Sequence, residues 1–418
     1  MLPIERQKAI QELWRRGNLS YKFHPGQQTI ENAYQKVTAK LFVGNAARRY
    51  GKTTWAIIKT IECAIKTPKA KIIIATAFQT DCEEIMLPIF QQVFEDCPKN
   101  IEPTFNKTKK KYIFKNKSEI SLVGLDKRPS AGRGRKNSLY VIDECAFVSN
   151  LSHVYSSVII PMTMYNPDAR IILISTPPTS PEHPFKDFCA KAQLENAYVE
   201  LTIHQNPMCT PEIIAEYRKE CLTETDFQRE FECKFVTDEN LQLIPEFNEQ
   251  KHTFQASKRD EFFNFYRKYV CFDIGVVDPT AFIFGYFDYK AQKLVIEFES
   301  QLQHKEVTTK NIDQALKTTS DYKTFERQLC DSNNLILVND LNIEYKHNVI
   351  PTTKEDLLSM IAALRMAFHQ DRIIIKTSCP TLINQLKYGI WNKNKTAFER
   401  MNNHHWDFIA SLVYLWRG

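Results

Sequence analysis

The sequence lacks several features that would place the protein in a membrane or a secreted scaffold. It has no apolar run near the roughly 20 residues that a membrane-spanning helix needs. Its 11 cysteines are scattered singly with no Cys-x-x-Cys pair, so neither a zinc site nor a disulfide framework is indicated. The N-terminal segment is polar and charged, which predicts no secretory signal peptide. We therefore expect a cytosolic protein with reduced, mostly buried thiols and no membrane partner.

Composition sets broad limits on the fold and its partners. Of the 418 residues, 43% are hydrophobic and 25% are charged, and the net charge is +6. These values are typical of a globular protein with two or three domains. The small basic excess is compatible with binding nucleic acid but does not require it.

The first candidate site lies at residues 41–54. An apolar run that suits a buried strand is followed by a turn of small residues, and Lys52 then opens a segment with helical periodicity. Such an arrangement binds phosphates: backbone N–H groups and the helix dipole face the anion, with Gly51 and Thr54 beside them. Lys52 would reach the outer phosphates and Thr53 would hold Mg²⁺. The usual first glycine is replaced by Ala46, so an ordinary strand-to-helix turn is the alternative.

Two further apolar strands end in polar pairs. Residues 138–142 lead into Asp143 and Glu144, where the first carboxylate can hold Mg²⁺ and the second can orient an attacking water. Residues 171–174 lead into Ser175 and Thr176, whose hydroxyls can sense a γ-phosphate. The alternatives are a helix cap for the acidic pair and a proline-enforced turn for the hydroxyl pair. Alternating strands and helices predict a doubly wound α/β domain with its ligand at the carboxyl ends of the strands.

Four more residues are candidates for the nucleotide site. Gln27 follows an aromatic residue and a proline upstream of the loop, and its amide suits the edge of adenine; a turn and helix start is the alternative. Arg48 and Arg49 lie inside the phosphate loop, and Arg133 lies in a Gly-rich segment. An arginine at either place can stabilise the charge of a transferring phosphoryl group. The alternative is that these arginines lie on solvated surface turns and have no catalytic role.

The second half of the chain carries separate carboxylates. Asp273 and Asp331 each end a predicted strand, and His404 and Asp407 share one face of a predicted helix. Converging carboxylates suit two Mg²⁺ or Mn²⁺ ions, which clamp both oxygens of a phosphodiester displacement. Each aspartate alone is also a common cap. Asp278 is a weaker candidate, and Asp340 competes with Asp331.

Taken in order, these motifs resemble the large subunit of tailed-bacteriophage (or prophage) terminase over residues 20–418. Residues 47–53 resemble the deviant phosphate loop of that family, in which an arginine precedes the lysine by four positions. Asp143-Glu144 resembles its metal-and-base pair, and Ser175-Thr176 its coupling motif. Arg133 resembles an arginine that acts on the nucleotide of the neighbouring subunit.

The resemblance extends to the second half and implies a fold. Asp273, Asp331 and Asp407 resemble a ribonuclease-H-like metal triad, and His404 resembles the metal-site histidine of one branch. The implied architecture is a P-loop (ASCE-type) doubly wound α/β ATPase domain followed by a ribonuclease-H-like α/β nuclease domain. Where helical periodicity is lost, we place a linker. The predicted boundaries are 1–235 for the ATPase domain, 236–262 for the linker and 263–418 for the nuclease domain.

The function implied by this resemblance is that of a viral DNA-packaging motor. ATP hydrolysis with Mg²⁺ would drive double-stranded DNA into a procapsid, and an endonuclease using two Mg²⁺ or Mn²⁺ ions would cut concatemeric DNA. The implied partners are double-stranded DNA, the portal protein, the small terminase subunit and copies of the chain in a ring, in the cytoplasm of the bacterial host.

Three alternatives stay open on the residues alone. The first is a helicase-type DNA-dependent ATPase, although the second half lacks an arginine-bearing motor motif. The second is a nucleotide-gated DNA-binding subunit with a degenerate nuclease. The third is a transposase or integrase, which shares the acidic triad but does not explain Lys52 together with Asp143-Glu144.

Overall fold

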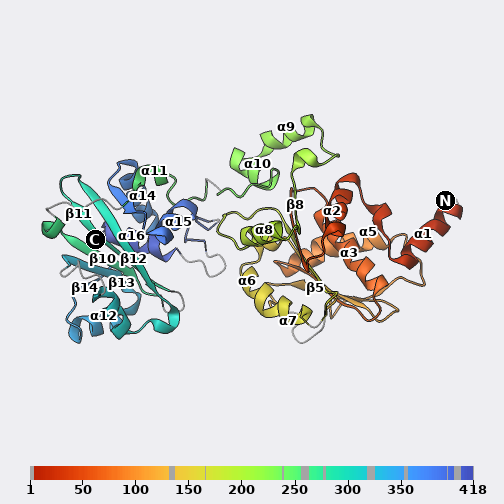
Figure 1. The fold of residues 1–418 in the computed structure, drawn as a ribbon, viewed down its shortest axis with the longest axis horizontal. Helices are drawn as coiled ribbons and strands as arrows, with labels where there is room; N and C mark the ends of the chain where they lie inside the picture. Colours follow the sequence, from red (N-terminus) through yellow and green to blue (C-terminus); the bar gives the residue numbers. More distant parts are fainter. Residues whose placement is uncertain are drawn as a thin grey trace. The chain divides into compact units, whose positions relative to one another are not determined.

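The computed structural model contains two compact units, Met1–Val236 and Thr237–Gly418 (Figure 1). The structure describes residues 4–130, 137–164, 166–237, 240–255, 263–275, 279–317, 325–352, 356–392, 394–399 and 406–417. Within these ranges, no helix has the length and apolar character needed to cross a membrane.

The first unit is built on an eight-stranded sheet with the order β3-β4-β5-β2-β6-β7-β1-β8. The strands from β5 to β8 in this order are parallel, and β3 and β4 pair antiparallel at one edge. The strands are β1 (Leu41–Ala46), β2 (Lys71–Thr76), β3 (Thr104–Asn106), β4 (Lys111–Ile113), β5 (Glu119–Gly124), β6 (Leu139–Asp143), β7 (Arg170–Ser175) and β8 (Tyr198–Leu201).

Helices cover both faces of this sheet. In Figure 1, α6, α7 and α8 lie on one side of the strands, and α2, α3 and α5 lie on the other. The helices are α1 (Ile4–Arg16), α2 (Pro25–Lys36), α3 (Lys52–Lys66), α4 (Gln79–Asp81), α5 (Leu87–Phe94), α6 (Leu151–His153), α7 (Ile160–Thr163), α8 (Phe185–Leu194), α9 (Pro211–Glu220) and α10 (Glu224–Glu230). This is the doubly wound plan predicted from the alternation of strands and helices.

The central strands are buried, and apolar residues make up most of each one. Every residue of β1 and of β6 is buried, and β2 and β7 are exposed only in part at their first residue. A parallel strand covered by helices on both faces reads as a continuous apolar run, since neither face meets water. The same runs identified these strands in the sequence. Their carboxyl ends, and the polar residues that follow, meet at one edge of the sheet.

The second unit is built on a seven-stranded sheet with the order β14-β13-β10-β11-β12-β15-β9. Strands β10, β11 and β12 form an antiparallel meander, and the flanking pairs are parallel. The strands are β9 (Thr253–Phe254), β10 (Lys268–Asp273), β11 (Thr280–Asp288), β12 (Lys293–Leu302), β13 (Arg327–Asp331), β14 (Val349–Thr352) and β15 (Ile373–Lys376). The antiparallel pair predicted for residues 280–298 is confirmed.

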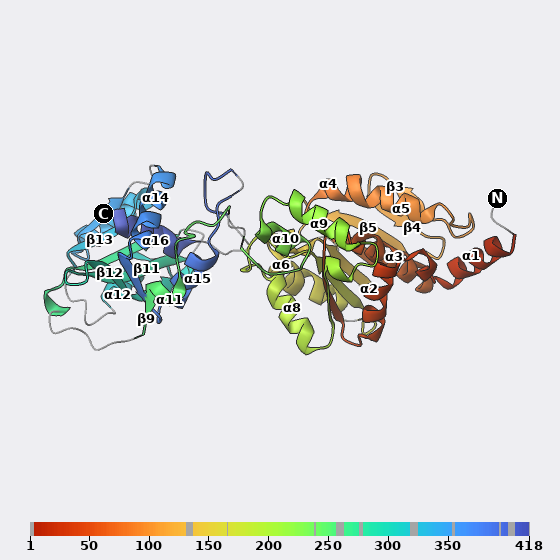
Figure 2. The same ribbon diagram turned by 90° about the horizontal axis from the view of Figure 1, so that it is seen from above.

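The two faces of the second sheet carry separate apolar cores. Cys271 of β10 belongs to one core, whereas its neighbours Val270 and Phe272 belong to the other. This alternation follows from the period of two in a strand. Helices α14, α15 and α16 contribute to the first core, and α12 and α13 to the second. The helices are α11 (Glu249–His252), α12 (Thr309–Lys317), α13 (Leu335–Ile343), α14 (Leu357–His369), α15 (Pro380–Tyr388) and α16 (Asp407–Arg417), several of which are labelled in Figure 2.

Part of the interval predicted as a linker is packed into the second unit. Leu243 and Ile244 are fully buried in its core. Strand β9 pairs with β15 through Thr253 and Phe254. The loss of helical periodicity after residue 235 therefore reflects short elements and turns as well as a change of unit. The three-part boundary scheme itself stays a prediction.

Candidate functional site

The loop between β1 and α3 has the geometry of a phosphate cradle. Gly51 caps α3 with φ +86°, a left-handed conformation that favours glycine. A Cβ added to Gly51 would lie 2.5 Å from His24 Nε2 and 2.7 Å from Gln27 Nε2. The loop thus closes tightly over α2, and the N-terminus of the 15-residue helix α3 points its backbone N–H groups outward from the sheet edge.

Four predicted residues converge beside this loop. Lys52 Nζ lies 3.0 Å from Glu144 Oε1. The hydroxyl of Thr53 donates to Asp143 Oδ2 at 2.7 Å. The order of the strands brings these groups together, because β6, which ends at Asp143, lies two strands from β1 across β7.

The converging side chains line a pocket of about 300 Å³. This volume lies at the lower end of the range for small-molecule sites, about 300–1,000 Å³. The lining residues are Arg48, Arg49, Gly51, Lys52, Thr53, Thr76, Asp81, Ile85, Met86, Asp143 and Glu144. The pocket therefore gathers the predicted phosphate-loop residues and the predicted acidic pair at one sheet edge.

Burial and a neighbouring like charge set the pKa of Asp143. The side chain of Asp143 is buried, and burial together with the neighbouring Glu144 raises the pKa of Asp143 to about 7. Burial alone would lower the pKa of Lys52, but Glu144 and Asp143 outweigh it and raise that pKa above its usual value. Lys52 therefore stays charged, and it is the main counter-charge for both carboxylates.

The donor set suits a hard divalent cation. Asp143 Oδ1 is buried and has no hydrogen-bond partner within the described ranges of the chain. A carboxylate oxygen and a hydroxyl within 2.7 Å of each other, Asp143 and Thr53, are the types of oxygen ligand that Mg²⁺ takes in phosphate sites. The residues present therefore fit Mg²⁺ bound together with a nucleotide.

Other predicted nucleotide residues lie behind the pocket rather than in its lining. Gln27 is buried and donates through Nε2 to the carbonyl of Gly51 at 3.0 Å, while its Oε1 accepts from the N–H of His24 at 3.1 Å. Gln27 thus connects α2 to the phosphate loop at Gly51. Its role as an adenine contact stays a prediction. Thr54 is half-buried on α3 and also lies outside the lining.

Ser175 contacts the acidic pair directly. Its hydroxyl donates to Glu144 Oε2 at 3.1 Å and accepts from the N–H of Ala146 at 3.2 Å. Thr176 is buried next to it. The sequence indicated that these hydroxyls face a phosphate. In the structure, Ser175 links Glu144 to the end of β7, a contact that no sequence pattern indicated, and the phosphate-sensing role stays a prediction.

The arginine candidates differ in placement. Arg48 is exposed, and its guanidinium lies 3.8 Å from Glu230 at the end of α10, while its N–H donates to the Glu230 carbonyl at 2.8 Å. Arg49 has φ 64° and, like Arg48, lines the pocket. Arg133 lies outside the described residues. Glu230 was not predicted, because a single acidic residue at a helix end gives no sequence signal.

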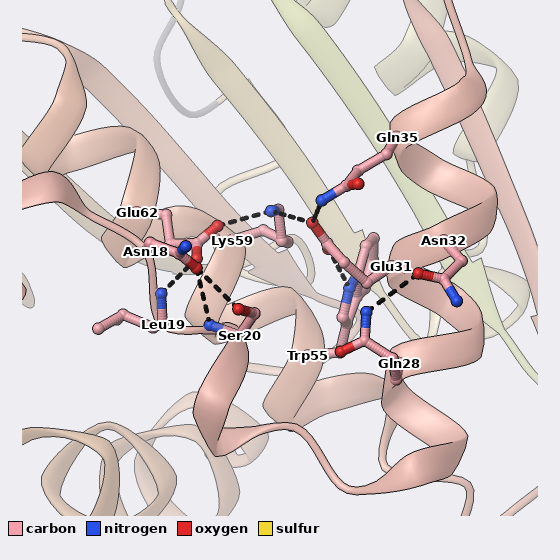
Figure 3. Close-up of polar contacts among 10 residues, drawn as sticks. All are labelled: Asn18, Leu19, Ser20, Gln28, Glu31, Asn32, Gln35, Trp55, Lys59 and Glu62. Carbon is pink, nitrogen blue, oxygen red and sulfur yellow. Dashed lines mark hydrogen bonds and ion pairs between the residues drawn. The ribbon is translucent and has the colours of Figure 1, made fainter. Parts of the chain in front are cut away.

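A buried polar network anchors α3 behind the phosphate loop. Lys59 Nζ lies 2.9 Å from Glu31 of α2 and 2.6 Å from Glu62 of α3 (Figure 3). Glu31 also accepts from the indole of Trp55 at 2.9 Å, and Glu62 accepts from the N–H of Leu19 at 2.7 Å. The network fixes α3 against α2, so the helix end that would face a phosphate has a rigid base.

The second unit places two predicted carboxylates side by side. Strands β10 and β13 are parallel, with Phe272 opposite Cys330. Asp273 and Asp331 are the next residues on each strand, so they occupy neighbouring positions at one sheet edge. Asp331 is fully buried and accepts from the N–H of Ile274 at 3.1 Å. Asp340, in contrast, is exposed on α13.

The third predicted carboxylate opens a helix that crosses these strands. Asp407 is the first residue of α16, which packs against β10, β11 and β13. Burial raises the pKa of Tyr414 on the same helix, and Asp273, Asp331 and Asp407 raise it further. All three carboxylates therefore lie within electrostatic reach of one phenol.

The structure describes only part of the predicted ligand set at this end of the sheet. Across the ranges that the structure describes, no group of three or more His, Cys, Asp or Glu side chains is arranged to hold a metal ion. His404 and Asp278 lie outside the described residues. Carboxylate oxygens are suitable ligands for Mg²⁺ or Mn²⁺, so Asp273 and Asp331 fit part of such a site. The complete predicted ligand set stays a prediction.

Comparison with known families decides the relationship. A family profile described as "Terminase large subunit, T4likevirus-type, N-terminal" matches residues 43–251, half of the chain. The chain belongs to the terminase large subunit family. The matched region contains the phosphate loop and Asp143-Glu144, and it extends through the first unit into the start of the second.

Individual relatives agree with this assignment. The chain is 26% identical over 296 residues to the large subunit of the terminase of Escherichia phage T5, a match that covers 67% of this chain and 66%, just under two thirds, of that protein. The crystal structure of the HK97 bacteriophage large terminase aligns with a TM-score of 0.59 at 10% identity and covers 98% of both chains. The likeness in structure confirms the predicted fold class, a P-loop α/β unit followed by a ribonuclease-H-like α/β unit.

Proposed function

We propose that this chain is a viral DNA-packaging motor that couples ATP hydrolysis to translocation of double-stranded DNA and carries a metal-dependent endonuclease. The observation that carries the motor half is the convergence of Lys52, Thr53, Asp143 and Glu144 around one pocket. Membership of the terminase large subunit family supports the packaging role.

In the motor half, each residue has a role that follows from its chemistry. Lys52 and the N-terminus of α3 bind the phosphates of ATP, and Thr53 and Asp143 are the residues that would hold Mg²⁺. When bound, Mg²⁺ neutralises charge on the phosphates. Glu144 orients the attacking water, and Arg48, Arg49 or Arg133 stabilises the developing charge. Ser175 connects Glu144 to the end of β7. Together with Thr176, it would transmit a movement of Glu144 during ATP hydrolysis to the rest of the unit.

In the nuclease half, Asp273 and Asp331 would hold one or two Mg²⁺ or Mn²⁺ ions at the sheet edge, with Asp407 and His404 completing the set. Such ions stabilise both the attacking and the leaving oxygen of a phosphodiester. The proposed partners are double-stranded DNA, the portal protein, the small terminase subunit and further copies of the chain in a ring, acting in the cytoplasm of the bacterial host.

A pair of variants of the full chain tests both halves at once. Lys52→Ala should abolish ATP hydrolysis and leave metal-dependent cutting of plasmid DNA intact. Asp273→Ala should abolish cutting and leave ATP hydrolysis intact. Hydrolysis retained by the first variant would refute the motor site, and cutting retained by the second would refute the nuclease site.

A second candidate is a nucleotide-gated DNA-binding subunit with a degenerate nuclease. It is favoured by the finding that the described residues contain no three-member group suited to a metal ion. This candidate is non-enzymatic, and it predicts that the parent chain binds nucleotide but neither hydrolyses ATP nor cuts plasmid DNA in Mg²⁺ or Mn²⁺.

A further inference from the structure

The second unit contains a basic pocket at the sheet edge opposite its carboxylates. The pocket has a volume of about 350 Å³ and is lined by Arg267, Arg327, Arg372, Tyr269 and Trp416, among others. Arg267 and Arg327 lie at the starts of β10 and β13, and Arg372 directly precedes β15. Strand β13 is parallel to β10, and β15 is parallel to β12, which runs in the same direction as β10 because two antiparallel steps separate them. The amino ends of β10, β13 and β15 therefore lie at one end of the sheet, whereas Asp273 and Asp331 end β10 and β13 at the other.

The charge of this pocket is only partly neutralised. Arg267 pairs with Glu326 at 3.5 Å, and both side chains are largely exposed. Arg327 and Arg372 have no ion pair with any carboxylate in the portion of the chain that the structure describes, and both are exposed. The pocket lining thus contains three guanidinium groups and one carboxylate, that of Glu326. An arginine fork is suited to bidentate binding of a phosphate, so the pocket favours an anion of that shape.

Aromatic rings stand next to these cations. The guanidinium of Arg372 lies 5.2 Å from the ring centroid of Trp416, near the end of α16. Tyr269, which is half-buried, pairs in register with Arg327 across β10 and β13. Arginine groups beside indole and phenol rings combine a phosphate contact with a surface on which a base can stack. A simple inorganic anion would make no use of these rings.

We propose that this pocket binds a nucleotide unit, with its phosphate on Arg327 and Arg372 and its base against Trp416 or Tyr269. The unit belongs to a single-stranded stretch of nucleic acid or is a free mononucleotide; both present the same phosphate and base. The volume of about 350 Å³ is in the range of small-ligand sites. This site is separate from the proposed nuclease carboxylates and does not depend on their metals.

The separation from those carboxylates follows from α16 itself. Asp407 begins the helix and Trp416 lies nine residues later, which places them about 14 Å apart along the axis at roughly 1.5 Å per residue. A nucleic-acid strand held in this pocket would therefore bind several nucleotides away from the end of the sheet that carries Asp273 and Asp331.

The test measures binding of a short fluorescein-labelled poly(dT) strand by anisotropy, on the full chain and in EDTA so that no metal contributes. Arg327→Gln should weaken binding about tenfold and reduce the slope of log affinity against log salt by about 0.7 to 1. Trp416→Leu should weaken binding at least about fivefold with an unchanged salt slope. Lys310→Gln, which removes an exposed cation of α12, is the control and should change little.

A second arm separates the two sources. Unlabelled dTMP that displaces the strand at micromolar to millimolar concentration assigns the pocket to free nucleotides, and displacement only by unlabelled poly(dT) assigns it to a polynucleotide; either supports the proposal. Equal weakening of strand binding by Arg327→Gln and Lys310→Gln would overturn the proposal, because binding would then depend on the overall positive charge of the protein and not on this pocket. Displacement by a poly-glutamate peptide as effective as displacement by unlabelled poly(dT), at equal charge, would overturn it in favour of an acidic protein partner. Circular dichroism spectra and thermal unfolding curves that match the parent show that the second unit is folded in all three variants.

Discussion

Lys52 and Glu144 form an ion pair of 3.0 Å in which the lysine side chain is only 6% exposed. The same lysine is the group proposed to bind the outer phosphates, so a nucleotide must compete with Glu144 for it. Glu144 adopts φ 51° at the residue before a short 3₁₀ turn, a left-handed conformation that costs a non-glycine residue about 1–2 kcal/mol. The carboxylate is thus held at the pocket by backbone geometry as well as by charge.

Replacing Glu144 by glutamine separates binding from hydrolysis. Glu144→Gln removes the charge that holds Lys52 and the group proposed to orient water, while the side chain keeps its size. We expect turnover of ATP to fall about 10²- to 10⁴-fold and the affinity for a non-hydrolysable ATP analogue to be equal or higher. Single-turnover hydrolysis and equilibrium binding measure the two effects. Glu216→Gln, on the exposed face of α9, is the matched control, and a parallel loss of binding and turnover would contradict the assignment.

Replacing Gly51 by alanine tests the shape of the phosphate loop. The added Cβ would lie 2.5 Å from His24 Nε2 and 2.7 Å from Gln27 Nε2, and the φ of +86° is strained for alanine. We expect a loss of about 1–2 kcal/mol in the free energy of unfolding together with a marked loss of nucleotide affinity, measured by chemical denaturation and by ATP binding.

The control for this variant is Gly17→Ala, which also has a positive φ, +62°, but contacts the end of α3 instead of the loop. Gly17→Ala should lose stability without losing affinity for ATP beyond that of the parent. If both variants lost affinity equally, the effect would be one of general stability and the loop geometry would not explain it.

The sequence predicts the strands and the acidic ends better than it predicts hydrogen-bond partners. Apolar runs identified β1, β2, β6 and β7, because a strand covered by helices on both faces is mostly apolar. The pair Asp143-Glu144 could be recognised in the sequence because it directly follows the apolar residues of β6. The protein contacts of Gln27 and Ser175, in contrast, had no sequence signal, and their predicted nucleotide contacts stay predictions. A residue type specifies what a side chain can bind, but only the fold decides which partner is nearest.

A similar limit explains the anchoring network. Lys59, Glu31 and Glu62 are common residues with no motif, and their pairing depends on how α2 packs against α3. His24 and Gln27, however, form a capping box with the spacing of three that marks a helix N-terminus. The usual sequence signature has Ser or Thr at the N-cap, so histidine at this position gave no such signal.

The pair Asp313–His347 predicts a pH dependence of stability in the second unit. His347 Nε2 lies 2.8 Å and Lys317 Nζ lies 2.7 Å from Asp313 Oδ1. Burial alone would raise the pKa of Asp313, but the hydrogen bonds from Lys317 and His347 outweigh it and hold the pKa below its ordinary value. The stabilisation is therefore present above the unfolded pKa of about 3.9 and is lost as pH falls through the lower folded pKa.

The corresponding measurement is chemical denaturation of the parent chain and Asp313→Asn between acidic and neutral pH. Near neutral pH we expect Asp313→Asn to be less stable by about 1–2 kcal/mol, and this difference should shrink as pH falls below about 4. Asp340→Asn, which changes an exposed carboxylate on α13, should show no difference at any pH. A gap that widened in acid would reverse the sign of the proposed linkage.

Asp331 and Asp340 provide a matched pair for the nuclease proposal, because the sequence did not decide between them. Asp331 is fully buried at the end of β13, in the position next to Asp273, whereas Asp340 is exposed on α13. Asp331→Asn keeps an oxygen that can accept from the N–H of Ile274, so the fold should persist while one negative charge is lost. We expect this variant to lose metal-dependent plasmid cutting and to bind fewer Mn²⁺ ions by calorimetry, with ATP hydrolysis unchanged. Asp340→Asn should cut like the parent. The reverse pattern would move the metal site away from the ends of β10 and β13.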